Sequence, residues 1–286
     1  MDAPRRASFS EIAALRGVRA APEGVGDLWY LGDLRGLGLP TVAIVGTRAA
    51  TPYGKNLAFR FASEIGAAGC CIISGLALGI DAAAHEGALS ASAPTVGILG
   101  SGHRQFFPRR NLPLAERMLA GGGAVLSPFA PDQPAYPGQF LQRNGVVAGL
   151  ADALLVIEAP ARSGALNTAG WAAGSIPVFA VPGDVDRPHV QGCLALIRDG
   201  ATLARNAADV LAQLRITSMP LPLAPNAPRN PLQDAILAAL REGERSGDEL
   251  ADALDSKPAQ ILAALALLEI DGAIERRGGA RYGIGS

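Results

Sequence analysis

The sequence has few of the residues on which metal sites, disulfide frameworks and membrane spans depend. Its 286 residues include three cysteines, three histidines and two lysines, and no apolar run approaches the roughly 18 residues of a membrane-spanning helix. An odd number of cysteines without metal-ligand spacing indicates a reduced, cytoplasmic setting. The N-terminus lacks the apolar segment of a secretory signal. We therefore expect a cytoplasmic protein with no membrane partner, no metal and no cofactor.

Charge is also scarce and unevenly distributed. Charged residues make up 18% of the chain and hydrophobic residues 49%, which predicts a buried sheet rather than disorder. Residues 41–215 contain 13 Lys and Arg against 11 Asp and Glu, whereas residues 230–286 contain 6 against 10. There is no basic tail. A bound nucleic acid would have to be held by a few well-placed groups rather than by bulk attraction.

Between residues 41 and 215, short apolar runs rich in β-branched residues alternate with amphipathic or Ala-rich segments. The expected strands are 41–46, 71–74, 95–100, 124–127, 153–159 and 177–183, and the expected helices are 53–68, 80–91, 112–120, 138–150 and 165–174. This alternation predicts a Rossmann-like, doubly wound α/β domain with a mostly parallel sheet. Ligands of such sheets bind beyond the carboxyl ends of the strands, where the strand order reverses.

Three further segments flank this domain. Residues 1–40 are expected to form a short N-terminal lead-in, in which Leu28–Leu31 is a possible edge strand. Residues 216–229 contain four prolines and predict an extended linker. Residues 230–286 fit a small winged-helix domain, with helices at 232–241, after the Ser246–Glu249 capping box and at 258–270, and a wing around Gly278–Gly279.

Glycine-containing turns follow several of the expected strands. Gly46-Thr47-Arg48 follows the first strand. The backbone N–H groups of this turn and of the start of the next helix favour an anion. The planar, charged guanidinium group of Arg48 would also bind that anion. Ser74-Gly75 and Ser163-Gly164 also precede helices and offer similar nests for phosphate. For the first turn, an ordinary tight connection with a solvated arginine is the alternative.

Asp81 and His85 are four residues apart and therefore share one face of an expected helix. They would form either an acid–base pair or a helix-capping aspartate that orients the imidazole. We favour the second interpretation, because no nucleophile or metal ligand is spaced to join them.

A third loop combines small residues, arginines and aromatic rings. Gly100-Ser101-Gly102 leaves the end of a strand open, and Arg104, Arg109 and Arg110 follow together with Phe106 and Phe107. Arginines interleaved with aromatic residues suit a strand of nucleic acid, because bases stack on rings and guanidinium groups bind phosphates. A solvated loop that its phenylalanines anchor to the core is the alternative.

Motifs of catalysis are missing from the sequence. There is no nucleophile elbow, HExxH, paired CxxC or Walker A lysine, and the histidines have no metal spacing. Several phosphate nests without a catalytic set predict a non-enzymatic protein that binds phosphodiesters or nucleotides.

Eight motifs in order then identify a family resemblance. They are VAIVGTR, TPYG, SGLALGIDAAAH, GSG followed by FPRRN, FLQRNG followed by AGL, LLVIEAPARSGALNTA, VFAVPG and GCLALIRDGA. Together they cover about residues 28–215 and closely resemble the DprA/Smf family of DNA-processing proteins. The trailing winged helix resembles the C-terminal domain that many members carry.

The resemblance implies a Rossmann-like homodimer that binds single-stranded DNA, protects incoming DNA during natural transformation, displaces single-strand-binding protein and loads RecA recombinase, without catalytic activity. It implies that Gly46, Thr47 and Arg48 contact a backbone phosphate. Phe140, Arg143 and Asn144 would line the same pocket, with Phe140 as a stacking platform, and the Ser74-Gly75 and Gly100-Ser101-Gly102 turns would form its floor.

The sequence departs from the family pattern at several positions. Leu78 stands where arginine is common, a second arginine is missing after Arg143-Asn144, and Asn167 lies within Ser163-Gly-Ala-Leu-Asn-Thr-Ala. We expect Arg104, Arg109 and Arg110 to compensate for the missing cations. The alternative function is a nucleotide-binding or nucleoside-monophosphate-hydrolysing Rossmann-like protein, because Glu158 before Ala-Pro-Ala-Arg-Ser-Gly loosely resembles the glutamate of such enzymes.

Overall fold

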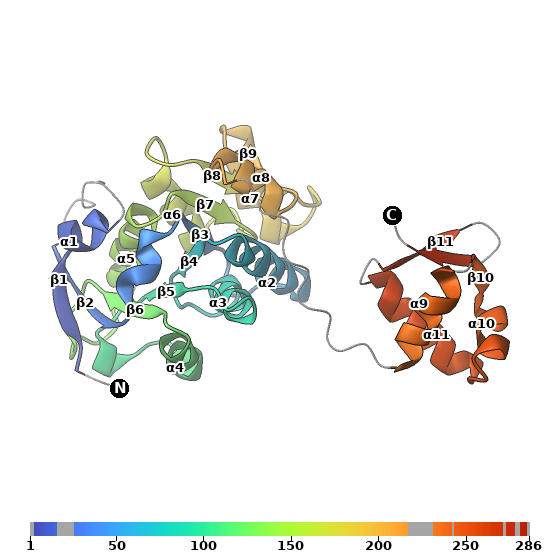
Figure 1. Ribbon diagram of the computed structural model, residues 1–286. Coiled ribbons are helices and arrows are strands. Elements are labelled where there is room, and N and C mark those ends of the chain that lie inside the picture. Colours follow the sequence, from blue (N-terminus) through green and yellow to red (C-terminus); the bar gives the residue numbers. More distant parts are fainter. Residues whose placement is uncertain are drawn as a thin grey trace. The chain divides into compact units, whose positions relative to one another are not determined.

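The chain forms two compact units, Met1–Met219 and Pro220–Ser286 (Figure 1). The computed structural model describes residues 3–15, 26–216, 231–241, 243–270, 273–277 and 281–284. The predicted linker after Ile216 and the predicted wing turn at Gly278–Gly279 lie outside these residues.

Within its described residues, the first unit is built around one sheet of nine strands. Its strands are β1 (Arg5–Ser8), β2 (Asp27–Gly32), β3 (Thr41–Val45), β4 (Cys71–Ser74), β5 (Thr95–Ile98), β6 (Ala124–Ser127), β7 (Ala153–Val156), β8 (Val178–Ala180) and β9 (Thr202–Leu203). Its α-helices are α1 (Phe9–Ala14), α2 (Pro52–Ala67), α3 (Ile80–Ser90), α4 (Leu112–Ala120), α5 (Pro137–Gly149), α6 (Gly164–Ala172), α7 (Gln191–Arg198) and α8 (Ala207–Gln213).

The strand order is β1-β2-β6-β5-β4-β3-β7-β8-β9. From β6 to β9 all neighbours are parallel, and β2 and β1 add antiparallel pairs at one end. The predicted Rossmann-like, mostly parallel sheet is therefore confirmed. The chain builds outward from β3 to β6 and then returns to β7 on the other side of β3, so the order reverses between β3 and β7.

Leu28–Leu31 forms a strand as predicted, but the prediction that this strand lies at the edge of the sheet is wrong. These residues lie in β2, whose outer side is paired with β1, and the Leu28 side chain is fully buried. The strand β1 escapes prediction because its sequence, Arg-Arg-Ala-Ser, has no apolar alternation and its side chains are exposed or half-buried.

Helices cover both faces of the sheet (Figure 1). Alternate residues of β3 show the two layers: Val42 and Ile44 pack in a cluster with α2, α3 and α8, whereas Ala43 and Val45 pack with α5 and α6. All five residues of β3 are buried, as expected for a strand covered on both sides. Burial raises the pKa of the Cys70 thiol to about 11 and that of Cys193 to about 12, and neither residue forms a disulfide.

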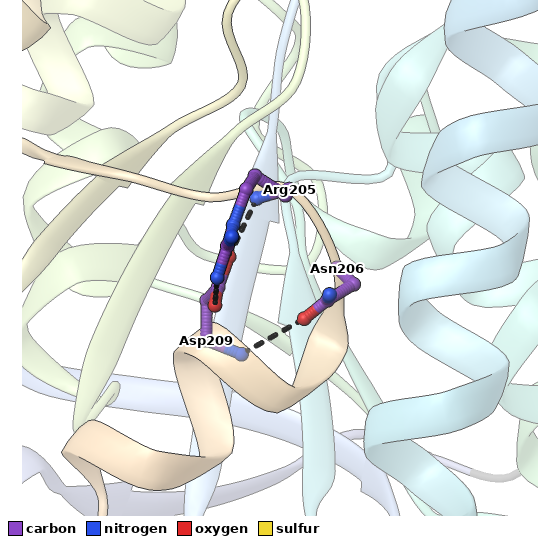
Figure 2. Close-up of polar contacts among 3 residues, drawn as sticks. All are labelled: Arg205, Asn206 and Asp209. Carbon is purple, nitrogen blue, oxygen red and sulfur yellow. Dashed lines mark hydrogen bonds and ion pairs between the residues drawn. The ribbon is translucent and has the colours of Figure 1, made fainter.

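Helix α8 begins with a capping cluster (Figure 2). The Asn206 side chain accepts a hydrogen bond from the Asp209 backbone N–H at 3.1 Å. Arg205 donates to Asp209 from Nε and Nη2, and its backbone N–H donates to the same carboxylate. These bonds, chiefly those of the Arg205 side chain, lower the pKa of Asp209 to about 2.

The second unit contains α9 (Pro231–Arg241), β10 (Arg245–Ser246), α10 (Gly247–Ala253), α11 (Pro258–Ile270), β11 (Ile274–Arg277) and β12 (Arg281–Ile284). The predicted capping box is present: Glu249 N–H donates to Ser246 Oγ, and Ser246 N–H donates to the Glu249 carboxylate. The strands form one sheet in the order β10-β12-β11, and an apolar core joins them to the helices. In the described part of the chain, no helix is long and apolar enough to cross a bilayer.

Candidate functional site

A cleft of about 680 Å³ lies at the carboxyl ends of the strands, beside the reversal between β3 and β7. The turns after β3, β4 and β7 and the N-terminal half of α5 line it. This is the position that a doubly wound sheet prescribes for a ligand. Nine of the predicted site residues line the cleft: Gly46, Thr47, Arg48, Gly75, Phe140, Arg143, Asn144, Ser163 and Gly164.

The exposed wall of the cleft combines a cation with aromatic rings. The Arg48 guanidinium carbon lies 4.9 Å from the centroid of the Phe140 ring. On the same wall, the Phe107 and Phe140 ring centroids are 5.9 Å apart and the rings are tilted by 59°. Phe107 is 48% exposed. Flat apolar surface beside a guanidinium that forms no ion pair with the described residues suits a ligand that is both aromatic and anionic.

The backbone of the turn after β3 is partly engaged within the fold itself. Thr47 N–H donates to the Glu158 carbonyl at 2.7 Å, and Thr51 donates to the Glu158 carboxylate from its backbone N–H (3.0 Å) and its hydroxyl (2.6 Å). A Cβ on Gly46 would fall 2.5 Å from the Ile80 side chain, so glycine here admits a neighbouring helix rather than a phosphate. The cationic capacity of this turn therefore resides in the Arg48 side chain.

The predicted nest at Ser74-Gly75 is filled by the chain's own carboxylate. Asp81 Oδ2 accepts hydrogen bonds from the backbone N–H groups of Gly75 (3.1 Å) and Ala77 (3.3 Å). Asp81 follows Gly75 by six residues, and its carboxylate occupies the N–H groups of this turn. The turn therefore cannot offer these donors to a ligand. Ser74 itself is buried and donates to the Ile44 carbonyl.

Asp81 neither caps α3 as expected nor orients His85. Gly79 occupies the cap position, and the His85 ring is held by Thr95, with 2.7 Å between Nδ1 and the Thr95 hydroxyl oxygen. Because Thr95 donates its own proton to the Ile72 carbonyl, His85 Nδ1 is the donor in this contact. Burial lowers the pKa of His85 to about 3. The imidazole is therefore a neutral structural group.

Arg143 is a buried residue at the inner wall of the cleft. Its side chain is 3% exposed, and Nη1 donates to the Gly75 carbonyl and, at 2.8 Å, to the Ile98 carbonyl. Burial lowers the pKa of Arg143 to about 10, although Asp81 opposes this change. Burial raises the pKa of Asp81, and Arg143 opposes that change in turn. Arg143 thus ties together the ends of β4 and β5 and offsets the charge of Asp81.

The third predicted nest is open to the cleft. Ser163 and Gly164 line the cleft, and α6 begins at Gly164, so its positive end lies there. Asn144 positions this segment by donating to the Gly164 carbonyl and to the Asn167 side-chain oxygen. Among the described residues, Ser163 Oγ and Arg143 Nε are buried without a hydrogen-bond partner.

Arg162 and Asn111 were not among the predicted site residues. Arg162 is exposed and lines the cleft, and its position directly before the Ser163-Gly164 turn was the available signal. Asn111 donates to the carbonyls of Leu76 (2.8 Å) and Ala77 (3.0 Å), and so joins the loop after β5 to the turn after β4. Its partners lie 34 and 35 residues away, which no local pattern reveals.

The remaining predicted residues lie behind or beside the cleft. A Cβ on Gly100 would fall 2.5 Å from the Phe140 ring, so Gly100 supports that ring. Ser101 and Gly102 are buried, and Gly102 N–H donates to the Gln133 carbonyl, so neither belongs to a cleft floor. Arg104 forms an ion pair with Asp132 at 2.6 Å, and Arg109 and Arg110 are exposed. Of the loop from Ser101 to Arg110, only Phe107 lines the cleft, so these side chains lie outside it.

Within the described residues, no group of three or more His, Cys, Asp or Glu side chains is arranged to hold a metal ion. The fold and the cleft define a Rossmann-like α/β protein with a winged-helix domain. A family model described as DNA recombination-mediator protein A matches residues 12–215, and one described as the DprA winged helix domain matches residues 219–280. The chain belongs to the DNA recombination-mediator protein A family, DprA/Smf.

Individual relatives agree with this assignment. The chain is 38% identical over 201 residues to protein Smf of Escherichia coli, which covers 70% of this chain and 54% of that protein. A solved structure of DNA processing protein A from Streptococcus pneumoniae has a TM-score of 0.67 and 33% identity, over 73% of this chain and 74% of that one. The Helicobacter pylori protein, described for its single-stranded DNA binding mode, has a TM-score of 0.64 and 28% identity, over 74% and 96%.

Proposed function

We propose that this chain is a cytoplasmic single-stranded DNA-binding protein that protects incoming DNA and loads RecA onto it during natural transformation. The observation that carries the proposal is the stacked pair of Arg48 and Phe140 on the wall of the cleft. A base stacks on an aromatic ring whatever its identity, and an adjacent guanidinium binds the phosphate that accompanies it. The Helicobacter pylori relative, described for binding single-stranded DNA, supports the choice of ligand.

The other groups of the cleft fit a polyanion held without chemistry. Arg162 adds a second exposed cation, and the N-terminus of α6 adds oriented N–H groups. The acids nearest the cleft already accept hydrogen bonds: Asp81 from two backbone N–H groups and Glu158 from Thr51. This supports a binding role over hydrolysis of nucleoside monophosphates, because Glu158 is committed to shaping the turn after β3.

The binding proposal is tested with fluorescein-labelled oligothymidine and a salt titration. Each phosphate contact on a single strand contributes about −0.7 to the slope of log K against log salt concentration. Arg48→Ala should weaken binding by roughly tenfold to 100-fold, since hydrogen bonds to charged groups contribute about 1.5–3 kcal/mol. Arg60→Ala, an exposed arginine of α2 that pairs with Glu64, is the matched control. Binding by Arg48→Ala that equals that of the control would overturn the proposal.

The partner and non-enzymatic parts of the proposal need separate assays. RecA loading predicts faster filament assembly on DNA coated with single-strand-binding protein when this chain is present. The homodimer implied by the family resemblance predicts twice the mass of one chain in sedimentation equilibrium. Incubation with AMP should release no adenine; release of the base would favour the nucleotide-hydrolysing alternative.

A further inference from the structure

Two further hollows continue from the cleft along the loop after β5. The first, of about 660 Å³, shares Phe107, Pro137 and Phe140 with the cleft. The second, of about 640 Å³, shares Phe106 and Arg109 with the first and extends to the N-terminal segment at Ala3 and Pro4. Because they share lining residues, the three spaces are adjacent to one another. We call the two added hollows the lateral groove.

The entrance to the lateral groove is aromatic. Phe140 forms part of both the cleft wall and the groove wall, and Phe107 is tilted against it with 5.9 Å between ring centroids. Phe107 remains 48% exposed, although a phenylalanine of a loop that served only as an anchor would be buried like its neighbour Phe106, which is 8% exposed. Successive exposed rings suit successive stacked bases.

Of the three arginines in this loop, only Arg109 both lines the lateral groove and lacks a counter-ion within the described residues. Arg104 lines the groove but pairs with Asp132 at 2.6 Å. Arg110 is exposed like Arg109, but it lines none of the three spaces. Arg109 borders both hollows of the groove, and Phe107 borders the first of them. A phosphate that followed a base stacked on Phe107 would meet its guanidinium group.

We propose that single-stranded DNA held in the cleft continues through the lateral groove, with a base on Phe107 and the following phosphate on Arg109. This inference rests on the proposed function, because it extends the same bound strand. It assigns to the loop after β5 the additional length of the binding footprint. The footprint should therefore exceed the nucleotides that the cleft alone contacts.

The test compares two adjacent arginines: Arg109, which lines the lateral groove, and Arg110, which does not. Labelled oligothymidines of increasing length, from four to about twelve nucleotides, are titrated at low salt with the unmodified chain, Arg109→Ala and Arg110→Ala. The affinity of the unmodified chain should rise with length until the groove is filled. Arg109→Ala should match it on the shortest oligonucleotides and fall behind on longer ones, with a salt slope smaller by about 0.7. Arg110→Ala should match it at all lengths.

Phe107→Ala gives an independent measurement: because Phe107 borders the cleft as well as the groove, its loss should grow with length and reach about fivefold to 150-fold on the longer oligonucleotides. Equal binding by Arg109→Ala and Arg110→Ala at every length would overturn the lateral groove. Arg48→Ala separates the two proposals, because it should weaken binding at all lengths. If Arg48→Ala weakens binding while Arg109→Ala and Phe107→Ala do not, only the groove fails. If Arg48→Ala has no effect at any length, the proposed function fails.

Discussion

The Arg48 guanidinium carbon lies 4.9 Å from the centroid of the Phe140 ring, and this contact joins the turn after β3 to the first turns of α5. The two residues are far apart in the sequence. A cation over an aromatic face is attracted by the ring quadrupole, so each side chain restrains the other before any ligand arrives. Ordering that is already present in the free protein reduces the entropic cost of binding.

We therefore expect Arg48 and Phe140 to act as a coupled pair. Arg48→Ala and Phe140→Ala should each weaken oligothymidine binding, and the double variant should lose less than the sum of the two single losses. The difference should be about 0.5–1 kcal/mol, the usual strength of an exposed cation–π contact. Fluorescence anisotropy on the four proteins of the cycle measures it. Strictly additive losses would mean that the two side chains contact the ligand independently.

A second prediction concerns Arg143, which the family resemblance assigns to the DNA pocket. Because its guanidinium group donates to the Gly75 and Ile98 carbonyls and lies beside buried Asp81, Arg143→Met should chiefly destabilise the fold. Removing one member of a buried charge pair costs about 3–5 kcal/mol. Urea unfolding of the variant measures this loss in the free energy of unfolding.

The double variant Asp81→Asn, Arg143→Met separates charge pairing from other roles of Arg143. Asparagine can still accept from the N–H groups of Gly75 and Ala77, but it carries no charge. The double variant should therefore be more stable than Arg143→Met alone. A variant of normal stability that fails to bind DNA would instead make Arg143 a direct ligand contact.

The layout of the fold follows from the sequence because it depends on local pattern. Strands such as β4 and β6 are short apolar runs, and the helices between them carry apolar stripes, so their order along the chain predicts a doubly wound sheet. The strand β1 lacks this pattern and becomes a strand only because β2 offers it an edge.

The details of the site could not be predicted in the same way. Gly46, Gly75 and Ser163 all follow the same local rule for an anion nest, but oxygen atoms of the fold accept from N–H groups of the first two turns. Whether a nest is open depends on whether an oxygen atom of the fold accepts from its N–H groups, as the Glu158 carbonyl does from Thr47 and the Asp81 carboxylate does from Gly75. Glu158 is 107 residues from Thr51, and this contact exists only once β3 and β7 are paired. The sequence pattern identifies the backbone N–H groups of such a turn. It does not identify the oxygen atoms from other parts of the fold that accept hydrogen bonds from them.

The winged-helix domain should contribute little to the affinity for single-stranded DNA. Helix α11 (Pro258–Ile270) contains no arginine or lysine. In the wing, Arg277 pairs with Glu244 and Glu275, and Arg281 pairs with Glu249. A chain that ends at Ile216 should bind oligothymidine within about twofold of the full chain, since paired arginines release few counterions. Anisotropy titrations at two salt concentrations provide the comparison, and a loss of tenfold or more would assign DNA contacts to this domain.

His85 should make the stability of the fold depend on pH. Its Nδ1–H is bound to Thr95, and its Nε2 is buried without a partner within the described residues, so a second proton would be an unpaired buried charge. Burial, and to a smaller extent the charge of Arg143, lower the pKa of His85 from 6.5 to about 3. Below pH 6.5 the unfolded chain therefore binds a proton that the folded chain does not. The stabilisation by neutral His85 is complete above that pH and is lost progressively toward pH 3.

The matched variant is His85→Asn, whose side-chain amide can still donate to Thr95 but does not titrate. Relative to this variant, the unmodified chain should lose about 1.4 kcal/mol in free energy of unfolding for each pH unit between about pH 6 and pH 4. Other groups, including Asp81 with its raised pKa, are present in both proteins, so their contributions cancel in the comparison. Urea unfolding at half-unit pH steps measures the difference. Parallel curves for the two proteins would mean that His85 accepts its second proton in the folded state as easily as in the unfolded state.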